Sequence, residues 1–201
     1  MLRLYDDLES GNGYKCRLLM HQLGVPFEHV LLDILRGETR TPEFLARNPN
    51  GRIPTLELED GTFLPESDAI LWYLSEGTPL LPEQRLERAQ VLQWMFFEQY
   101  SHEPNIATLR FWAHAGLLDE RSAFVPDKRR AGEAALDVME GHLGARRFFV
   151  GGRYTIADVA LFAYTHVAHE GGFDLSGRPA LRAWLARVAA QPGHVPITWR
   201  P

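Results

Sequence analysis

The sequence has little cysteine, no long hydrophobic run and no excess of positive charge. Its single cysteine, Cys16, excludes an intramolecular disulfide and any Cys-x-x-Cys redox or zinc motif, and it favours a reducing cytoplasm. No apolar stretch approaches the ~20 residues that cross a bilayer, and residues 1–7 lack the features of a signal peptide. We therefore predict neither membrane insertion nor export.

The charge balance argues against one class of partner. Lys and Arg total 21 against 26 Asp and Glu, which gives a net charge of −5. This charge argues against electrostatic binding of the nucleic-acid phosphate backbone by the chain as a whole. What is present is an ordinary globular composition, with 201 residues of which 45% are hydrophobic. That length suffices for one large domain or two small ones.

Residues 1–33 have the pattern of a strand, a helix and a second strand. Residues 2–5 are a short strand candidate, and residues 11–13, Gly-Asn-Gly, are typical of a turn. The next apolar residues recur at helical spacing, and Gly24 with Pro26 marks the end of that helix. Residues 27–33 form the second strand candidate, so we expect a unit with two parallel strands.

Residues 41–77 predict a helix, a hairpin and another helix. Thr41 followed by proline is typical of a helix start. Two strand candidates, residues 53–58 and 62–64, flank Asp60-Gly61, a strong two-residue hairpin signal. Ser67 is then the expected cap of the following helix.

The remainder is helical in pattern. The prolines in residues 78–84 indicate a linker, and residues 85–201 predict an all-α bundle. A bend or break is expected at residues 101–104, because Pro104 cannot continue the hydrogen-bond ladder. Residues 155–158, Thr-Ile-Ala-Asp, have the spacing of a capping box at the start of an apolar helix.

Together, this order of elements, Ile53-Pro54, Glu66-Ser67 and the capping box resemble the cytosolic glutathione transferases over nearly the whole chain. Residues 10–15, Ser-Gly-Asn-Gly-Tyr-Lys, are most similar to bacterial members, including glutathione-dependent disulfide reductases that keep Thr or Ser and Asn at two of these positions. The resemblance implies an α/β thioredoxin-like domain at residues 1–77 (βαβ, α, ββα) that binds glutathione. It also implies a homodimer, and a pocket for the electrophile contributed by the helical domain.

Glutathione needs an anchor for its carboxylates and a strand edge for its cysteinyl backbone. Ser67 and nearby amides are suited to the γ-glutamyl carboxylate, and Glu66 to the ammonium group, although both residues are also ordinary at a helix start. In the glutathione transferases the peptide bond before the proline at the position of Pro54 is cis. The resemblance therefore implies a backbone of Ile53 that is turned toward the ligand. An edge-strand proline is the alternative interpretation.

For the sulfur, the candidates are Ser10 and Asn12. Each can donate a hydrogen bond to a thiolate, and neither is a base at neutral pH, so we expect catalysis by stabilisation of the thiolate. Both residue types are also common turn formers. Cys16 lies on the apolar stripe of the first helix, so we expect a buried, inert thiol rather than a nucleophile.

The remaining candidates depend more on the resemblance. Arg36, Thr39 and Arg52 are expected near the glycyl carboxylate of glutathione, with a solvated surface role as the alternative. Aromatic side chains are expected to line the electrophile pocket, with a place in the core as the alternative. These side chains are Tyr100, Phe111 and Trp112.

We expect no metal site. His102, Glu103 and His114 match no known ligand spacing and are expected at the surface. The sequence therefore predicts a cytoplasmic glutathione transferase of detoxification type that directs the thiolate to an electrophilic carbon or a disulfide. The alternative is a glutathione- or protein-binding relative without turnover.

Overall fold

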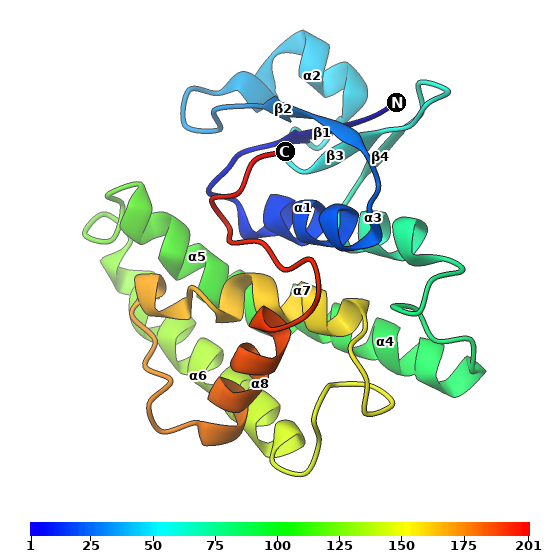
Figure 1. The fold of residues 1–201 in the computed structure, drawn as a ribbon. Coiled ribbons are helices and arrows are strands. Elements are labelled where there is room, and N and C mark those ends of the chain that lie inside the picture. The colour runs from blue at the N-terminus through cyan, green and yellow to red at the C-terminus, as the bar shows by residue number, and fades with distance from the viewer. The chain divides into compact units, whose positions relative to one another are not determined.

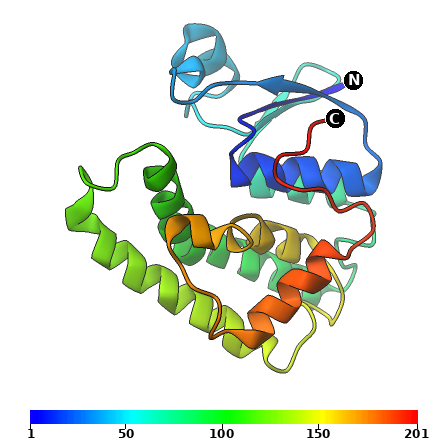
Figure 2. The same ribbon diagram turned by 60° about the vertical axis from the view of Figure 1, so that its left-hand side comes forward.

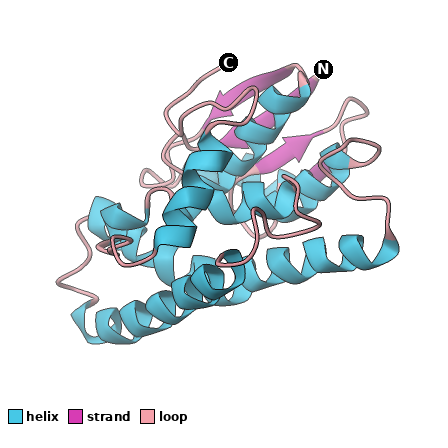
Figure 3. Ribbon diagram, turned by 60° about the horizontal axis from the view of Figure 1, so that its bottom comes forward, coloured by secondary structure: helices cyan, strands magenta, loops and turns pink.

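A computed structural model describes all residues from Met1 to Pro201, and they divide into two compact units. Unit 1 comprises Met1–Gly77 with Pro192–Pro201, and unit 2 comprises Thr78–Gln191. All the strands lie in unit 1, whereas unit 2 is helical (Figure 3). The expected α/β domain followed by a helical domain is therefore confirmed as the fold class.

Unit 1 is built on a mixed four-stranded sheet in the order β2-β1-β3-β4 (Figure 1). Its strands are β1 (Leu2–Asp6), β2 (Phe27–Leu31), β3 (Thr55–Glu57) and β4 (Phe63–Pro65). β1 pairs parallel with β2 and antiparallel with β3, which pairs antiparallel with β4. The predicted parallel pair and hairpin are both present.

Helices cover both faces of this sheet. The helices are α1 (Gly11–Leu23), the 3₁₀ turn η1 (Glu38–Arg40), α2 (Pro42–Arg47) and α3 (Ser67–Ser75). α1 and α3 lie on one face and α2 on the other (Figure 1). The core between the sheet and the helices α1 and α3 includes the fully buried side chains of Leu4, Cys16, Met20, Leu56 and Ile70.

The last ten residues, Pro192–Pro201, belong to unit 1. They run along α1 as a winding segment without helix or strand (Figure 2). The predicted helical range of residues 85–201 therefore ends too late. Their anchor is polar: the Tyr14 hydroxyl donates to the Val195 carbonyl at 2.6 Å, an interaction that no periodicity signals.

Two local predictions in unit 1 are wrong in detail. Gly11, Asn12 and Gly13 are not a turn but the first turn of α1, because Ser10 caps the helix before them. The hairpin loop has three residues, 59–61, rather than two. It is closed by bonds from Leu58 N to Thr62 O and from Gly61 N to Leu58 O, and Gly61 has the positive φ of 84° that glycine tolerates.

Unit 2 is a helical bundle. Its helices are α4 (Arg85–Phe97), η2 (Glu98–His102), α5 (Glu103–His114), η3 (Ser122–Phe124), α6 (Val125–Leu143), α7 (Ile156–Thr165), η4 (Ala168–Gly171) and α8 (Pro179–Ala189). Every residue of α7 is buried, so this helix forms the centre of the unit. None of the helices combines the length and the apolar character that a membrane span requires.

The expected break before Pro104 is instead a π-helical segment, η2, in which the Glu103 amide donates to the Glu98 carbonyl. Pro104 falls in the first turn of α5, where a missing N–H is tolerated. The predicted capping box of α7 is present: the Thr155 amide donates to Asp158 Oδ2 at 2.9 Å.

Candidate functional site

The loop between β1 and α1 presents Ser10 at the N-terminus of a 13-residue helix. The Ser10 Oγ accepts from the Gly13 amide at 3.2 Å, and its extended backbone is typical of an N-cap. The hydroxyl proton has no acceptor within the protein. The half-buried hydroxyl can therefore donate outward while it caps the helix.

Asn12 connects this helix to α3. The Ser67 hydroxyl donates to Asn12 Oδ1 at 3.3 Å, and it accepts from Lys15 Nζ at the same distance. Lys15 is fully buried and also pairs with Asp68 at 3.2 Å. The structure thus brings together two residues that are 55 positions apart and were predicted for different parts of one ligand.

Ser67 itself is not the cap of α3. Glu66 occupies the N-cap position with a φ of 70°, a conformation that is uncommon outside glycine, and Ser67 is the first helical residue. The Glu66 side chain is exposed, whereas Ser67 is buried, with only 5% of its surface exposed. This turn leaves the Glu66 carboxylate in solvent beside the first amides of α3.

The peptide bond between Ile53 and Pro54 is cis. Ile53 lies outside β3, and neither its N–H nor its carbonyl takes part in a backbone hydrogen bond. The residues beside it are held in place: Asn48 Nδ2 donates to the Arg52 carbonyl at 2.8 Å and to Thr55 Oγ1 at 3.3 Å. Ile53 is a half-buried residue with an unused backbone donor and acceptor, and these can pair with an extended peptide.

The other predicted ligand contacts are not joined to these residues. Arg36 and Arg52 are exposed, whereas Thr39, in η1, is buried with only 5% of its surface exposed. No hydrogen bond or ion pair links any of the three to Ser10 or to Ser67.

The predicted pocket aromatics lie in unit 2. Tyr100, in η2, is 87% exposed, and Phe111, in α5, is 41% exposed. Trp112 is half-buried beside it. Tyr100 and Phe111 are therefore surface residues of that unit rather than parts of its core.

His102 and His114 do not form a cluster. His102 is fully buried with Nε2 at 2.9 Å from Thr165 Oγ1, so its predicted surface position is wrong. His114 pairs with Glu170 at 2.9 Å. The structure holds no group of three potential metal ligands.

Sequence reasoning missed the buried charges that support the loop. Asp6 and Arg17 are both fully buried and form an ion pair of 2.9 Å between Oδ2 and Nε. Burial raises the pKa of Asp6, and His29 and Arg17 oppose that shift. The available signal was a charged residue at the end of a strand followed by a basic residue inside an amphipathic helix.

We expect Cys16 to be inert. The thiol is fully buried, and burial raises its pKa well above the ordinary value. A thiol-specific disulfide reagent should label the native protein far more slowly than the denatured one, and Cys16→Ala should retain activity within about twofold. Rapid labelling of native protein with parallel loss of activity would restore Cys16 as a nucleophile.

Comparison with known proteins identifies the family. The family profile for the glutathione S-transferase N-terminal domain matches residues 10–76, and that for the C-terminal domain matches residues 120–187. The glutathione S-transferase-like protein LUC7 of a Fusarium species is 32% identical, over 92% of this chain and 87% of its own length. The chain belongs to the glutathione S-transferase family.

Solved structures agree with this assignment. A glutathione S-transferase of Pseudomonas fluorescens Pf-5 is 53% identical, with a TM-score of 0.95 over 98% of each chain. Ure2p in complex with glutathione is 26% identical, with a TM-score of 0.87 over 96% of this chain and 95% of its own.

Proposed function

We propose that this protein is a glutathione transferase that binds glutathione in unit 1 and stabilises its thiolate for attack on an electrophilic carbon or a disulfide. The observation that carries the proposal is the hydrogen bond of 3.3 Å between Ser67 Oγ and Asn12 Oδ1. It joins the start of α3, suited to a carboxylate, to the start of α1, suited to a thiolate. Glutathione bound to the related Ure2p supports the choice of ligand.

Each part of the tripeptide has a counterpart. The first amides of α3 would hold the γ-glutamyl carboxylate, with the Ser67 hydroxyl turning from Asn12 Oδ1 to donate to it, and Glu66 would hold the ammonium group. The free backbone of Ile53, set by the cis bond to Pro54, would pair with the cysteinyl unit. We keep Arg36, Thr39 and Arg52 as proposed neighbours of the glycyl end.

We assign thiolate stabilisation to Ser10. Its hydroxyl proton has no protein acceptor, and it lies at the N-terminus of α1. The Asn12 side chain is instead tied to α3, because its Oδ1 accepts from the Ser67 hydroxyl. Asn12 then orients the site and stabilises the negative charge of the thiolate less than Ser10 does. Since no accessible cysteine lies in the loop, disulfide reduction would use the glutathione thiolate alone: it attacks one sulfur and the other sulfur leaves as a thiolate.

Tyr100, Phe111 and Trp112 are proposed to contact the electrophile, because exposed and half-buried aromatic side chains suit an apolar substrate. A homodimer and a cytoplasmic location complete the proposal. Sedimentation gives the subunit number directly.

Calorimetry with glutathione, combined with assays on a chloronitrobenzene and on a mixed disulfide, tests the proposal. We expect binding together with turnover of at least one substrate. Binding without turnover would favour a non-catalytic glutathione-binding relative. The absence of binding would overturn the proposal and leave the protein-binding alternative.

A matched pair of variants locates the site. Ser67→Ala should weaken glutathione binding about tenfold, because it removes a buried hydroxyl that contacts Asn12 and Lys15. Ser75→Ala removes another buried hydroxyl of α3, at the opposite end of the helix, where it donates to the Trp72 carbonyl at 3.2 Å. It should leave the affinity unchanged, and equal effects of the two changes would contradict the site.

A further inference from the structure

Arg17 lies at the centre of a buried network in unit 1 that the reaction does not use directly. Its Nε pairs with Asp6 Oδ2 at 2.9 Å, and its Nη2 donates to the Leu8 carbonyl at 2.8 Å. Leu8 is in the loop that presents Ser10, and Asp6 is the last residue of β1. One guanidinium therefore holds both the end of the strand and the middle of the loop.

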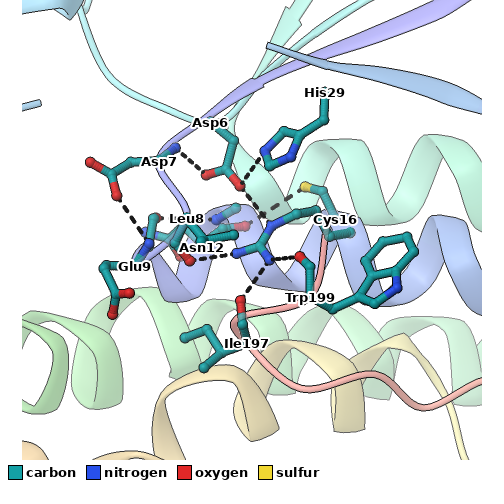
Figure 4. A network of polar contacts seen from close by, with 12 residues as sticks. Asp6, Asp7, Leu8, Glu9, Asn12, Cys16, His29, Ile197 and Trp199 are labelled. Carbon is teal, nitrogen blue, oxygen red and sulfur yellow. Dashed lines mark hydrogen bonds and ion pairs between the residues drawn. The ribbon is translucent and has the colours of Figure 1, made fainter. Parts of the chain in front are cut away.

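The remaining nitrogen of Arg17 binds the C-terminal segment. Nη1 donates to the Ile197 carbonyl at 2.6 Å and to the Trp199 carbonyl at 2.8 Å. Figure 4 shows both carbonyls converging on the network that contains Asp6 and Leu8. Because a guanidinium is planar, acceptors on Nη1 also fix the direction in which Nη2 donates.

Asp6 supports the loop from its other side. Its Oδ1 accepts from the Asp7 amide at 2.7 Å, which fixes the first residue of the loop. A Cβ at Gly13 would overlap the Asp6 carboxylate, so the carboxylate lies directly against the residue whose amide bonds to Ser10. Movement of the Asp6–Arg17 pair would therefore move both ends of the segment that carries Ser10.

The C-terminal segment is anchored along one face of α1. Tyr14 donates to the Val195 carbonyl at 2.6 Å, and His21 Nδ1 lies 2.8 Å from the Gly193 carbonyl. With Arg17 between them, these residues follow the i, i+3, i+7 spacing of a single helix face. The segment is thus built into unit 1, and only its last part supplies acceptors to Arg17.

We propose that Arg17 is a positioning residue for Ser10, the proposed donor to the thiolate. Residues 197–199 fix the orientation of the Arg17 guanidinium. This inference rests on the proposed function, because it concerns how Ser10, the residue proposed to stabilise the thiolate, is held in position. The segment would then set the reactivity of bound glutathione without touching it. The anchors proposed for glutathione, at Ile53 and at the start of α3, make no contact with Arg17 in the network described, so affinity should depend on the segment much less than reactivity.

Two shortened chains test this. A chain that ends after Pro196 loses both acceptors of Nη1 but keeps the Asp6 pair and the contacts to Val195 and Gly193. A chain that ends after Trp199 keeps both acceptors and is the matched control. We expect the first to raise the pKa of bound glutathione by about 1 unit and to lower kcat at pH 7 about threefold, with KM for glutathione within twofold. The control should match the full chain.

Arg17→Lys provides an independent variant. It keeps a cation beside Asp6 but cannot serve the strand, the loop and the segment together, so it should show the same split between kcat and KM. Thermal unfolding of every chain defines a temperature at which all are folded. An unchanged thiol pKa and kcat in the chain that ends after Pro196 would overturn the inference.

Amide hydrogen exchange separates this inference from the proposed function. Exchange at Ser10 and Tyr14 should accelerate at least about threefold in the chain that ends after Pro196, while Ile70 in α3 stays protected. If the full chain does not lower the thiol pKa at all, the proposed function fails, and this exchange comparison alone decides whether the segment fixes the loop. Equal exchange in both shortened chains would then contradict the positioning role.

Discussion

In Ser10→Ala, kcat at pH 7 with saturating glutathione is expected to fall about threefold to tenfold and to recover near pH 9. A free thiol with a pKa of about 8.5 is only a few per cent thiolate at pH 7, and one donor that lowers the pKa by ~2 units makes it mostly thiolate. The gain is partly offset because nucleophilicity falls with the pKa. At pH 9 the thiol ionises without help, so the hydroxyl is no longer needed.

Two controls separate the charge effect from the loss of a helix cap. Ser10→Thr keeps the hydroxyl and should keep the rate. Thr41→Ala removes a similar cap, in which Thr41 Oγ1 accepts from the Phe44 amide at 3.2 Å, and it should cost about 1 kcal/mol of stability without changing kcat. A loss in Ser10→Ala that is equally large at pH 7 and pH 9 would contradict the assignment.

Asp158→Ala should cause the largest loss of stability, about 3 kcal/mol or more in the free energy of unfolding at pH 7. The buried carboxylate accepts from the Trp184 indole at 2.9 Å, from the Phe149 amide at 3.2 Å, and from both the amide and the hydroxyl of Thr155, at 2.9 and 3.1 Å. Alanine leaves these buried donors without an acceptor. Chemical denaturation measures the change.

Asp174→Ala is the matched control, because this exposed carboxylate accepts from the amide and the hydroxyl of Ser176 alone. It should leave the unfolding midpoint nearly unchanged. If both variants unfold alike, the capping box does not stabilise unit 2.

The pH dependence of the Asp158 contribution has a definite sign. Burial raises the pKa of Asp158 from 3.8 to about 6 in the folded protein, despite its hydrogen bonds. The folded chain therefore retains a proton that the unfolded chain loses, and this contribution to stability falls as the pH rises from about 4 to 6. The stability difference between the natural protein and Asp158→Ala should be greater at pH 4 than at pH 7, by up to about 3 kcal/mol.

Much of the fold could be predicted because its signals are local. The apolar spacing around Cys16, the cap at Thr41 and the spacing from Thr155 to Asp158 each depend on a few neighbouring residues, and the structure has the corresponding helices. The hairpin length was missed because the left-handed Gly61 suits a three-residue loop as well as a two-residue one.

The sequence predicts the candidate site only residue by residue. The resemblance predicts Ser10, Asn12 and Ser67 as site residues, but no local pattern shows that a hydrogen bond joins the last two across 55 positions. Buried Lys15 and Arg17 were missed because a charge within a helix normally faces solvent. Their acceptors come from α3, from β1 and from the C-terminal segment, which only the tertiary structure brings together.

The central claim is that Ser10 stabilises the thiolate of glutathione bound to unit 1. Titration of the ultraviolet absorbance of bound glutathione thiolate against pH tests it most directly. The account predicts an apparent pKa about 2 units below that of free glutathione in the natural protein, and a value near that of the free thiol in Ser10→Ala. Tight binding with an unshifted pKa in the natural protein would contradict it.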